Sequence, residues 1–273
     1  VRKAIADEFV VEPRPPMSMK GKSDLLPVFA VSGMKQHRTI RLQEPAYALL
    51  MIGRKREMTQ LAEKIEMAVH GRGQIIGITA EAGMGKSRLV AEGIRLAHRR
   101  GLIGYGGACQ SDGSNSPYLV WRAVWSAFFD LDPSLPLRKQ IRSLEGELQD
   151  RIPEHIDALP LLGTVLGLPI PENDFTRALQ PKDRKAQLET MLVKCIESSA
   201  RDAAEENGGL IFVLEDLHWI DPVSFDLLEL VARAVEDLPV LLAKIHRMQR
   251  GDPPFFAWSH YDEGEKLIVE FAE

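Results

Sequence analysis

A short glycine-containing stretch between two regular segments constrains the fold of this 273-residue chain more than any other feature. Residues 74–80 are an apolar run of strand length, and residues 86–100 place Val90, Ile94 and Ala97 on one face of a helix. Between them the chain changes to small residues and two glycines. A strand, a glycine turn and a helix in this order are typical of a phosphate cradle, because the N–H groups and the positive dipole end of the helix point at the anion.

The segment AEAGMGKS fits the Walker A pattern GxxxxGK[ST], except that Ala80 stands where the first glycine is usual. Alanine is compatible with that position provided that its φ is negative. Gly83 and Gly85 are expected to let backbone amides close around phosphate oxygens without a Cβ in the way. Lys86 is expected to reach the β- and γ-phosphates of a bound nucleotide, and the Ser87 hydroxyl to ligate Mg²⁺. The residues expected to contact the nucleotide here are Ala82, Gly83, Met84, Gly85, Lys86, Ser87 and Arg88.

A second segment, LIFVLEDLHWID at residues 210–221, has the layout of a Walker B strand. The strand ends at Glu215 and Asp216, so it delivers two carboxylates to the edge where an open α/β sheet binds ligands. One carboxylate is expected to hold the water shell of the Mg²⁺ ion, and the other to polarise the attacking water. The spacing leaves this division open, although position favours Glu215 for the metal and Asp216 for the water.

Shortly after the acidic pair come three residues that we interpret as structural: His218, Trp219 and Asp221. Asp221 precedes Pro222 and is expected to cap the next helix. Trp219 is expected to pack against the protein, and His218 lacks the partner ligands of a metal site. Two further sets recur at helical spacing and predict core stripes: Trp121, Trp125 and Phe128, and then Leu188, Met191, Leu192, Cys195 and Ile196.

The order of segments predicts the fold class. Strands that alternate with helices imply parallel pairing with right-handed crossovers, and hence a three-layer α/β domain. The expected strands are 74–80, 101–109, 208–216 and 238–246, and the expected helices are 53–71, 86–100 and 222–236, with 118–205 mainly helical around a polar break at 168–183.

Composition narrows the class of protein. A net charge of −5 argues against a broad nucleic-acid footprint. Cys109 and Cys195 are too few for a disulfide scaffold or a zinc site, which favours a reducing, cytoplasmic location. There is no apolar run of membrane-spanning length and no signal-peptide core, so no membrane partner is expected. Because residues 1–12 already read as folded sequence, we expect the chain to be an internal piece of a longer protein.

Taken together, IGRKREM at residues 52–58, the loop at 80–87 and LEDLHWID at 214–221 resemble the STAND branch of the AAA-related signalling ATPases, a group of P-loop NTPases. The resemblance extends over about residues 50–250, and the acidic segment is its most specific part. It resembles in particular the form found in large bacterial regulators and in multidomain adenylate cyclases.

This resemblance implies further site residues. Ile52, Gly53 and Arg54 would lie against the adenine, with Gly53 letting the backbone approach the base. Arg247 would stand in for the arginine that senses the γ-phosphate, and Arg250 is the alternative. The helical lid and winged-helix domains that normally follow are not part of this sequence.

The N-terminal strip EFVVEPRPPMSMKGKSDLLPVFAV resembles the closing hairpin of a class III nucleotide cyclase homology domain, with Lys20-Gly21 as its turn. The metal-binding aspartates and base-recognition residues of such an α+β domain would lie upstream. The predicted organisation is a cyclase remnant at 1–33, a linker at 34–51, the ATPase domain at 52–250 and an unassigned tail at 251–273.

These resemblances imply a regulatory switch domain that binds ATP, hydrolyses it slowly with Mg²⁺ and biases an upstream cyclase domain. The implied partners are that cyclase domain and C-terminal helical and sensor domains of the same chain, and oligomer formation is left open. This chain itself is expected to make no cyclic nucleotide and to bind no nucleic acid. The alternative is the ATPase core of a DNA-binding transcriptional regulator whose helix-turn-helix lies outside these residues.

Overall fold

The computed structural model describes most of the chain and divides it into two compact units, Val1–Ile40 and Arg41–Glu273. The described residues are 9–17, 26–34, 51, 53–80, 83–111, 116–247 and 266–270, of which 9–17, 26–34, 247 and 266–270 are described by their backbone alone.

The first unit contains an antiparallel hairpin. Strand β1 (Phe9–Met17) pairs with β2 (Leu26–Met34), which confirms the hairpin predicted for this strip. The register shifts in the second half of β1, where consecutive prolines have no N–H to donate to the ladder. The turn expected at Lys20-Gly21 lies outside the described residues.

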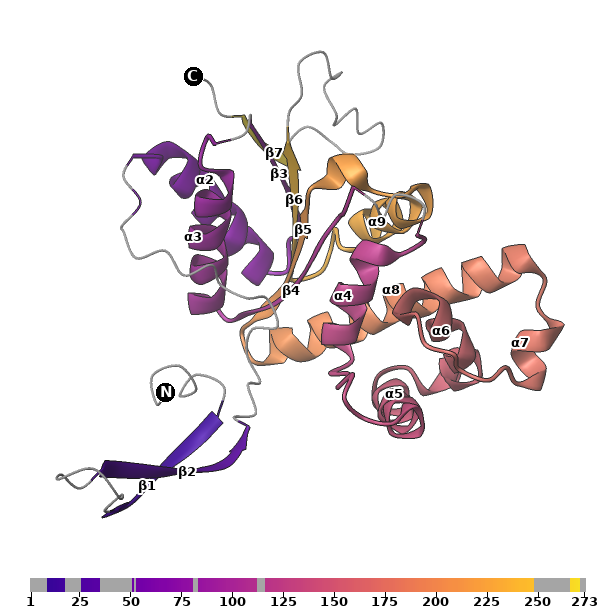
Figure 1. Cartoon of the computed structure of the whole chain (residues 1–273). Helices are drawn as coiled ribbons and strands as arrows, with labels where there is room; N and C mark the ends of the chain where they lie inside the picture. The colour runs from indigo at the N-terminus through magenta and orange to yellow at the C-terminus, as the bar shows by residue number, and fades with distance from the viewer. Residues whose placement is uncertain are drawn as a thin grey trace. The chain divides into compact units, whose positions relative to one another are not determined.

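The second unit is built on a parallel sheet with the strand order β4-β5-β6-β3-β7 (Figure 1). The strands in that order are β4 (Leu102–Ala108), β5 (Gly209–Glu215), β6 (Val240–Arg247), β3 (Gln74–Ala80) and β7 (Lys266–Glu270). The first four match the predicted strands. The fifth, β7, pairs with β3 and lies in the stretch that the sequence pattern left unassigned.

Helices cover both faces of this sheet, which confirms the predicted three-layer α/β fold (Figure 1). Helices α2 (Lys55–Val69) and α3 (Lys86–Arg99) pack on the face formed by residues such as Ile76 and Ile78. The opposite face, which includes Phe212, packs against α4, α8 and α9. Successive strand residues point to opposite faces, so each buried strand supplies both cores.

The chain between β4 and β5 is largely helical, as predicted. Its elements, with the helix that follows β5, are α4 (Leu119–Phe128), α5 (Leu137–Arg151), η1 (Pro153–Leu161), α6 (Leu162–Leu166), α7 (Asp174–Ala178), α8 (Pro181–Glu205) and α9 (Pro222–Ala234). Both predicted stripes are buried. The Trp121 indole donates a hydrogen bond from Nε1 to the carbonyl of Ser224 over 2.9 Å and so joins α4 to α9.

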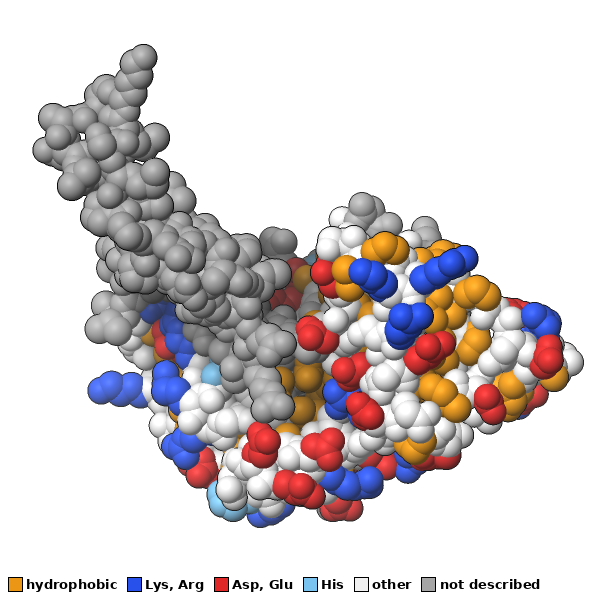
Figure 2. Space-filling model, turned by 90° about the horizontal axis from the view of Figure 1, so that it is seen from below, with side chains coloured by type: hydrophobic (Ala, Val, Ile, Leu, Met, Phe, Trp, Pro, Cys, Tyr) orange, Lys and Arg blue, Asp and Glu red, His pale blue; other side chains and the backbone are white. Residues whose placement is uncertain are grey.

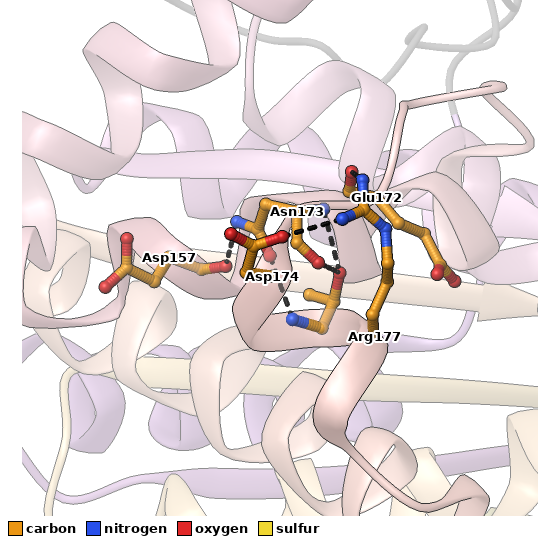
Figure 3. A network of polar contacts seen from close by, with 6 residues as sticks. Asp157, Glu172, Asn173, Asp174 and Arg177 are labelled. Carbon is orange, nitrogen blue, oxygen red and sulfur yellow. Dashed lines mark hydrogen bonds and ion pairs between the residues drawn. The ribbon is translucent and has the colours of Figure 1, made fainter.

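The predicted polar break at 168–183 contains a helix that the sequence pattern missed. The short helix α7 begins with a capping box, in which Asn173 Oδ1 accepts from the amide of Thr176 at 2.8 Å and Thr176 Oγ1 accepts from the amide of Asn173 at 3.2 Å. An ion pair between Arg177 and Asp174 (2.7 Å) closes the turn (Figure 3). Local polar bonds, rather than an apolar face, form this helix.

The helical side of this unit has a mixed surface, on which hydrophobic side chains are surrounded by charged ones (Figure 2). An open groove of about 780 Å³ lies between α5 and η1, floored by apolar residues such as Ile141 and Leu159. None of its lining residues belongs to the loop at 80–87 or to the acidic segment. Within the described ranges, no helix is both long enough and apolar enough to span a bilayer.

Candidate nucleotide site

The loop after β3 has the conformation that its glycines allow. Gly83 and Gly85 have φ values of 84° and 86°, in the left-handed region that L side chains rarely adopt. Among the described residues, no atom lies within 4 Å of where a Cβ would stand at either position, so conformation is what requires glycine here. Met84 between them is half-buried. Ala80 ends β3 without a positive φ, which explains why alanine fits the first position of the pattern.

Lys86 begins α3 and folds back over the loop. Its Nζ donates a hydrogen bond to the carbonyl of Ala80 at 2.6 Å, so the ammonium group bridges the two ends of the turn. Ser87 is exposed on the same first turn of the helix, whose N-terminus carries the positive end of the dipole. The guanidinium of Arg88 lies along the helix instead, with Nη2 3.1 Å from Glu92 Oε1.

The residues expected at the adenine are described only in part. Ile52, like Ala82 of the loop, lies outside the described residues. Gly53 is exposed with a φ of 80°, and Arg54 also has a positive φ, of 57°, where α2 begins. The Arg54 guanidinium forms an ion pair with Glu57, at 3.0 Å. Two consecutive left-handed residues make a sharp turn into α2.

The acidic pair lies where β5 reaches the surface. Strand β5 is buried up to Glu215, which is half-buried, and the next residue, Asp216, is exposed. Burial raises the pKa of the Glu215 carboxyl, and the neighbouring charge of Asp216 raises it further. Asp216 has a φ of 54°, a conformation that costs a non-glycine residue free energy and is common at functional sites.

The sheet places β6 between the loop strand and the acidic strand. Its last residue, Arg247, pairs with Ala80, so the backbone of Arg247 lies beside the start of the loop. Only the backbone of Arg247 is described by the structure. On its other side β6 pairs with β5 only as far as Leu214 opposite Lys244. The ladder between the two strands therefore ends just before Glu215, and the carboxyl ends of all three strands lie at one edge (Figure 1).

A residue that the sequence analysis did not assign to the site, Cys109, adjoins the acidic pair. It follows β4, and its amide donates to the carbonyl of Glu215 at 2.9 Å. Burial raises the pKa of the thiol to about 12, with a further contribution from the charges of Asp221 and Asp216. The thiol is therefore neutral at physiological pH and serves as packing at this edge.

The predicted roles of Asp221 and Trp219 have different outcomes. Asp221 caps α9, because its Oδ1 accepts a hydrogen bond from the amide of Ser224 at 2.9 Å. Trp219 packs only in part, because the residue is 40% exposed while its ring lies 5.0 Å from the ring of His218, centroid to centroid. The partial exposure arises in the single 3₁₀ turn η2 (Leu217–Trp219), which buries Leu217 and leaves Trp219 nearer the surface.

His218 has an aromatic partner that the sequence analysis did not identify. Its ring lies 5.6 Å from the ring of His246, centroid to centroid, with an interplanar angle of 83°. His246 lies near the end of β6 and is buried. Only the sheet order brings the two histidines together, because they are far apart in sequence and neither belongs to a spaced motif.

The residues at this edge suit a Mg²⁺ ion that is shared with phosphate. Magnesium usually takes one or two protein carboxylates together with waters and phosphate oxygens. Ser87, at the start of α3, and Glu215 and Asp216, at the end of β5, offer such a set at one edge of the sheet. Among the described residues there is no cluster of three or more His, Cys, Asp or Glu side chains that would form an all-protein cage.

Comparisons with known proteins agree with this geometry. The family described as "AAA ATPase domain" matches residues 51–243 of the chain. An uncharacterized protein of Rhizobium meliloti (strain 1021) is 28% identical over 204 residues, which is 72% of this chain and 18% of that protein. The chain thus spans less than a fifth of the length of that relative.

Proposed function

Because the chain belongs to the AAA ATPase domain family, we propose that it binds ATP with Mg²⁺ at the loop 83–87 and hydrolyses it slowly, as the switch domain of a larger signalling protein. The observation that carries the proposal is the loop itself. It combines two left-handed glycines, a helix N-terminus and the folded-back Lys86 at the edge that also holds the acidic pair.

The chain's own residues have separate tasks in this proposal. The amides of the loop and the Lys86 ammonium hold the β- and γ-phosphates, as charge-assisted donors do in such cradles. Ser87 and Glu215 hold the Mg²⁺ ion, and Asp216 orients the attacking water. When bound, the Mg²⁺ ion supplies positive charge that neutralises the phosphate oxygens. Arg247 senses the γ-phosphate, an assignment supported by the pairing of its backbone with Ala80.

The signalling context is the finer part of the proposal. The N-terminal unit contains an antiparallel hairpin, which suits the closing hairpin of a cyclase homology domain. ATP bound at the second unit would then bias an upstream cyclase domain and C-terminal helical and sensor domains of the same chain. Such a switch works by holding one arrangement of neighbouring segments while the γ-phosphate is present.

The division of labour between the two carboxylates is tested by Asp216→Asn. If Asp216 orients the water, the variant should bind Mg-ATP as the wild type does and hydrolyse it roughly a hundredfold more slowly, because general-base groups contribute about that much. Fluorescent-ATP titration and single-turnover hydrolysis measure the two quantities. Loss of Mg²⁺-dependent binding would instead assign Asp216 to the metal, and unchanged binding and turnover would remove the acidic pair from the site.

A further inference from the structure

The hydrogen-bonded ladder between β5 and β6 ends one residue before the acidic pair. The ladder from β3 to β6 continues to Ala80 opposite Arg247, whereas the ladder from β5 to β6 stops at Leu214 opposite Lys244. Beyond that point no described backbone pairing joins the turn that carries the carboxylates to the end of β6. Beyond the end of that ladder, side-chain contacts can help to set the distance between these two parts of the site.

The contact between His218 and His246 joins the turn to β6 beyond the end of that ladder. The two rings meet edge to face, with 5.6 Å between their centroids, an arrangement that aromatic pairs favour. His246 is 3% exposed and directly precedes Arg247, so it is held firmly within β6. Nδ1 of His218 is buried without a hydrogen-bond partner in the described part of the chain. The ring, rather than this nitrogen, therefore makes the contact.

The turn that carries His218 begins directly at Asp216. Asp216 begins the 3₁₀ turn in the left-handed conformation, and its carbonyl accepts from the amide of Trp219 at 3.0 Å. Leu217 anchors the turn in the core, at 2% exposure. A displacement of the His218 ring would therefore displace Asp216, two residues away along a closed turn.

We propose that His218 and His246 are positioning residues, whose ring contact sets the acidic pair at a fixed distance from the end of β6 and from the phosphate loop paired with it. This inference rests on the proposed function and adds two residues that touch neither nucleotide nor metal. Its consequence is specific. The loop holds phosphate by itself, but the Mg²⁺ ion is held well only when loop and carboxylates are correctly spaced.

The measurement is the Mg²⁺ enhancement of ATP affinity, defined as the Kd for a fluorescent ATP analogue in EDTA divided by its Kd in excess Mg²⁺. We expect His218→Ala to lower this ratio about tenfold, the scale on which supporting residues affect metal sites, and to leave the Kd in EDTA unchanged. His218→Phe keeps the ring and should retain the wild-type ratio. His155→Ala, the same change in η1, is the matched control and should also retain it.

A double variant separates this contact from general packing. If the two rings act as one contact, His218→Ala with His246→Ala should lower the ratio no further than either single change. Thermal melting reports folding in each case, and a merely structural role would lower the melting temperature without changing the ratio. Should His218→Ala not fold, His218→Gln, which also lacks the aromatic ring, takes its place with the same expected result.

Three outcomes would overturn the inference: a wild-type ratio in His218→Ala, an equal loss in His218→Phe, or additive losses in the double variant. A wild type that does not bind ATP, or whose binding ignores Lys86→Ala, would instead overturn the proposed function and this inference with it. The two failures are therefore distinguished within one set of titrations.

Discussion

Glu215 lies where a fully buried strand reaches the surface, and its surroundings destabilise the charged form of its carboxyl group. The half-buried position and the adjacent Asp216 both raise its pKa. Acidic residues with such shifts are concentrated at functional sites, because a site that is to receive a cation tolerates uncompensated negative charge. Without a bound cation, the charged Glu215 side chain therefore lowers the free energy of unfolding.

This destabilisation predicts that the difference in stability between the wild type and Glu215→Gln depends on pH. With its folded-state pKa raised, Glu215 contributes stability while it is protonated, at pH values below about 4, and this contribution is lost as the pH rises through the folded pKa. Without Mg²⁺, Glu215→Gln should therefore have a higher free energy of unfolding than the wild type at pH 7. The difference should shrink as the pH falls toward 4.

Urea unfolding in EDTA at both pH values measures this difference. Glu145→Gln, on the exposed surface of α5, is the matched control for loss of one carboxylate. The claim that the surroundings of Glu215 destabilise its charged form would be contradicted by either of two results. One is a Glu215→Gln variant that is no more stable than the wild type at pH 7, and the other is a stability advantage that grows as the pH is lowered.

Secondary-structure elements were predictable where their pattern was local. Continuous apolar runs identified β3 to β6, since strands buried on both faces have no polar side. The five-residue strand β7 was missed because its pairing with β3 depends on the completed sheet. Helix α7 was missed because a capping box, and not an apolar face, forms it. The partial exposure of Trp219 was not predicted because sequence spacing does not reveal a 3₁₀ turn.

The loop that joins β3 to α3 yields a paired prediction on two glycines. Gly85→Ala should destabilise the protein by about 1–2 kcal/mol, because Gly85 has a φ of 86° that alanine adopts only at that cost. Gly146→Ala, in the middle of α5 with open space around the new Cβ, should stabilise it by about 0.5–1 kcal/mol. Chemical denaturation measures the change in the free energy of unfolding for each variant. Equal changes for Gly85→Ala and Gly146→Ala would contradict the left-handed conformation of Gly85.

At the scale of the whole molecule, the sequence predicted a site whose parts the sheet brings together. The loop and the acidic segment are more than a hundred residues apart in sequence, yet their strands are separated by β6 alone. Motif spacing was enough to name the loop and the acidic pair. It was not enough to identify the contact between His218 and His246 or the position of Cys109, because these depend on strand order and on where the ladders end.

The two-unit organisation predicts that this chain makes no cyclic nucleotide. Cyclisation requires two metal ions held by carboxylates and groups that stabilise charge at the α-phosphate. The described part of the first unit is a two-stranded hairpin, and two strands alone do not hold such a set at fixed separation. Incubation with ATP or GTP and Mn²⁺ should give no cyclic product. Appreciable cyclic AMP or cyclic GMP would show that a catalytic centre lies within this chain.

The most direct test of the account is the affinity for Mg-ATP with and without the Lys86 ammonium. Loss of this charge-assisted contact should cost about 1.5–3 kcal/mol, which is roughly a ten- to more than a hundredfold weaker Kd. Lys139→Ala, which removes an exposed lysine from α5, is the matched control and should bind as the wild type does. Equal affinities of the wild type and Lys86→Ala would contradict the claim that this loop holds the phosphates of ATP.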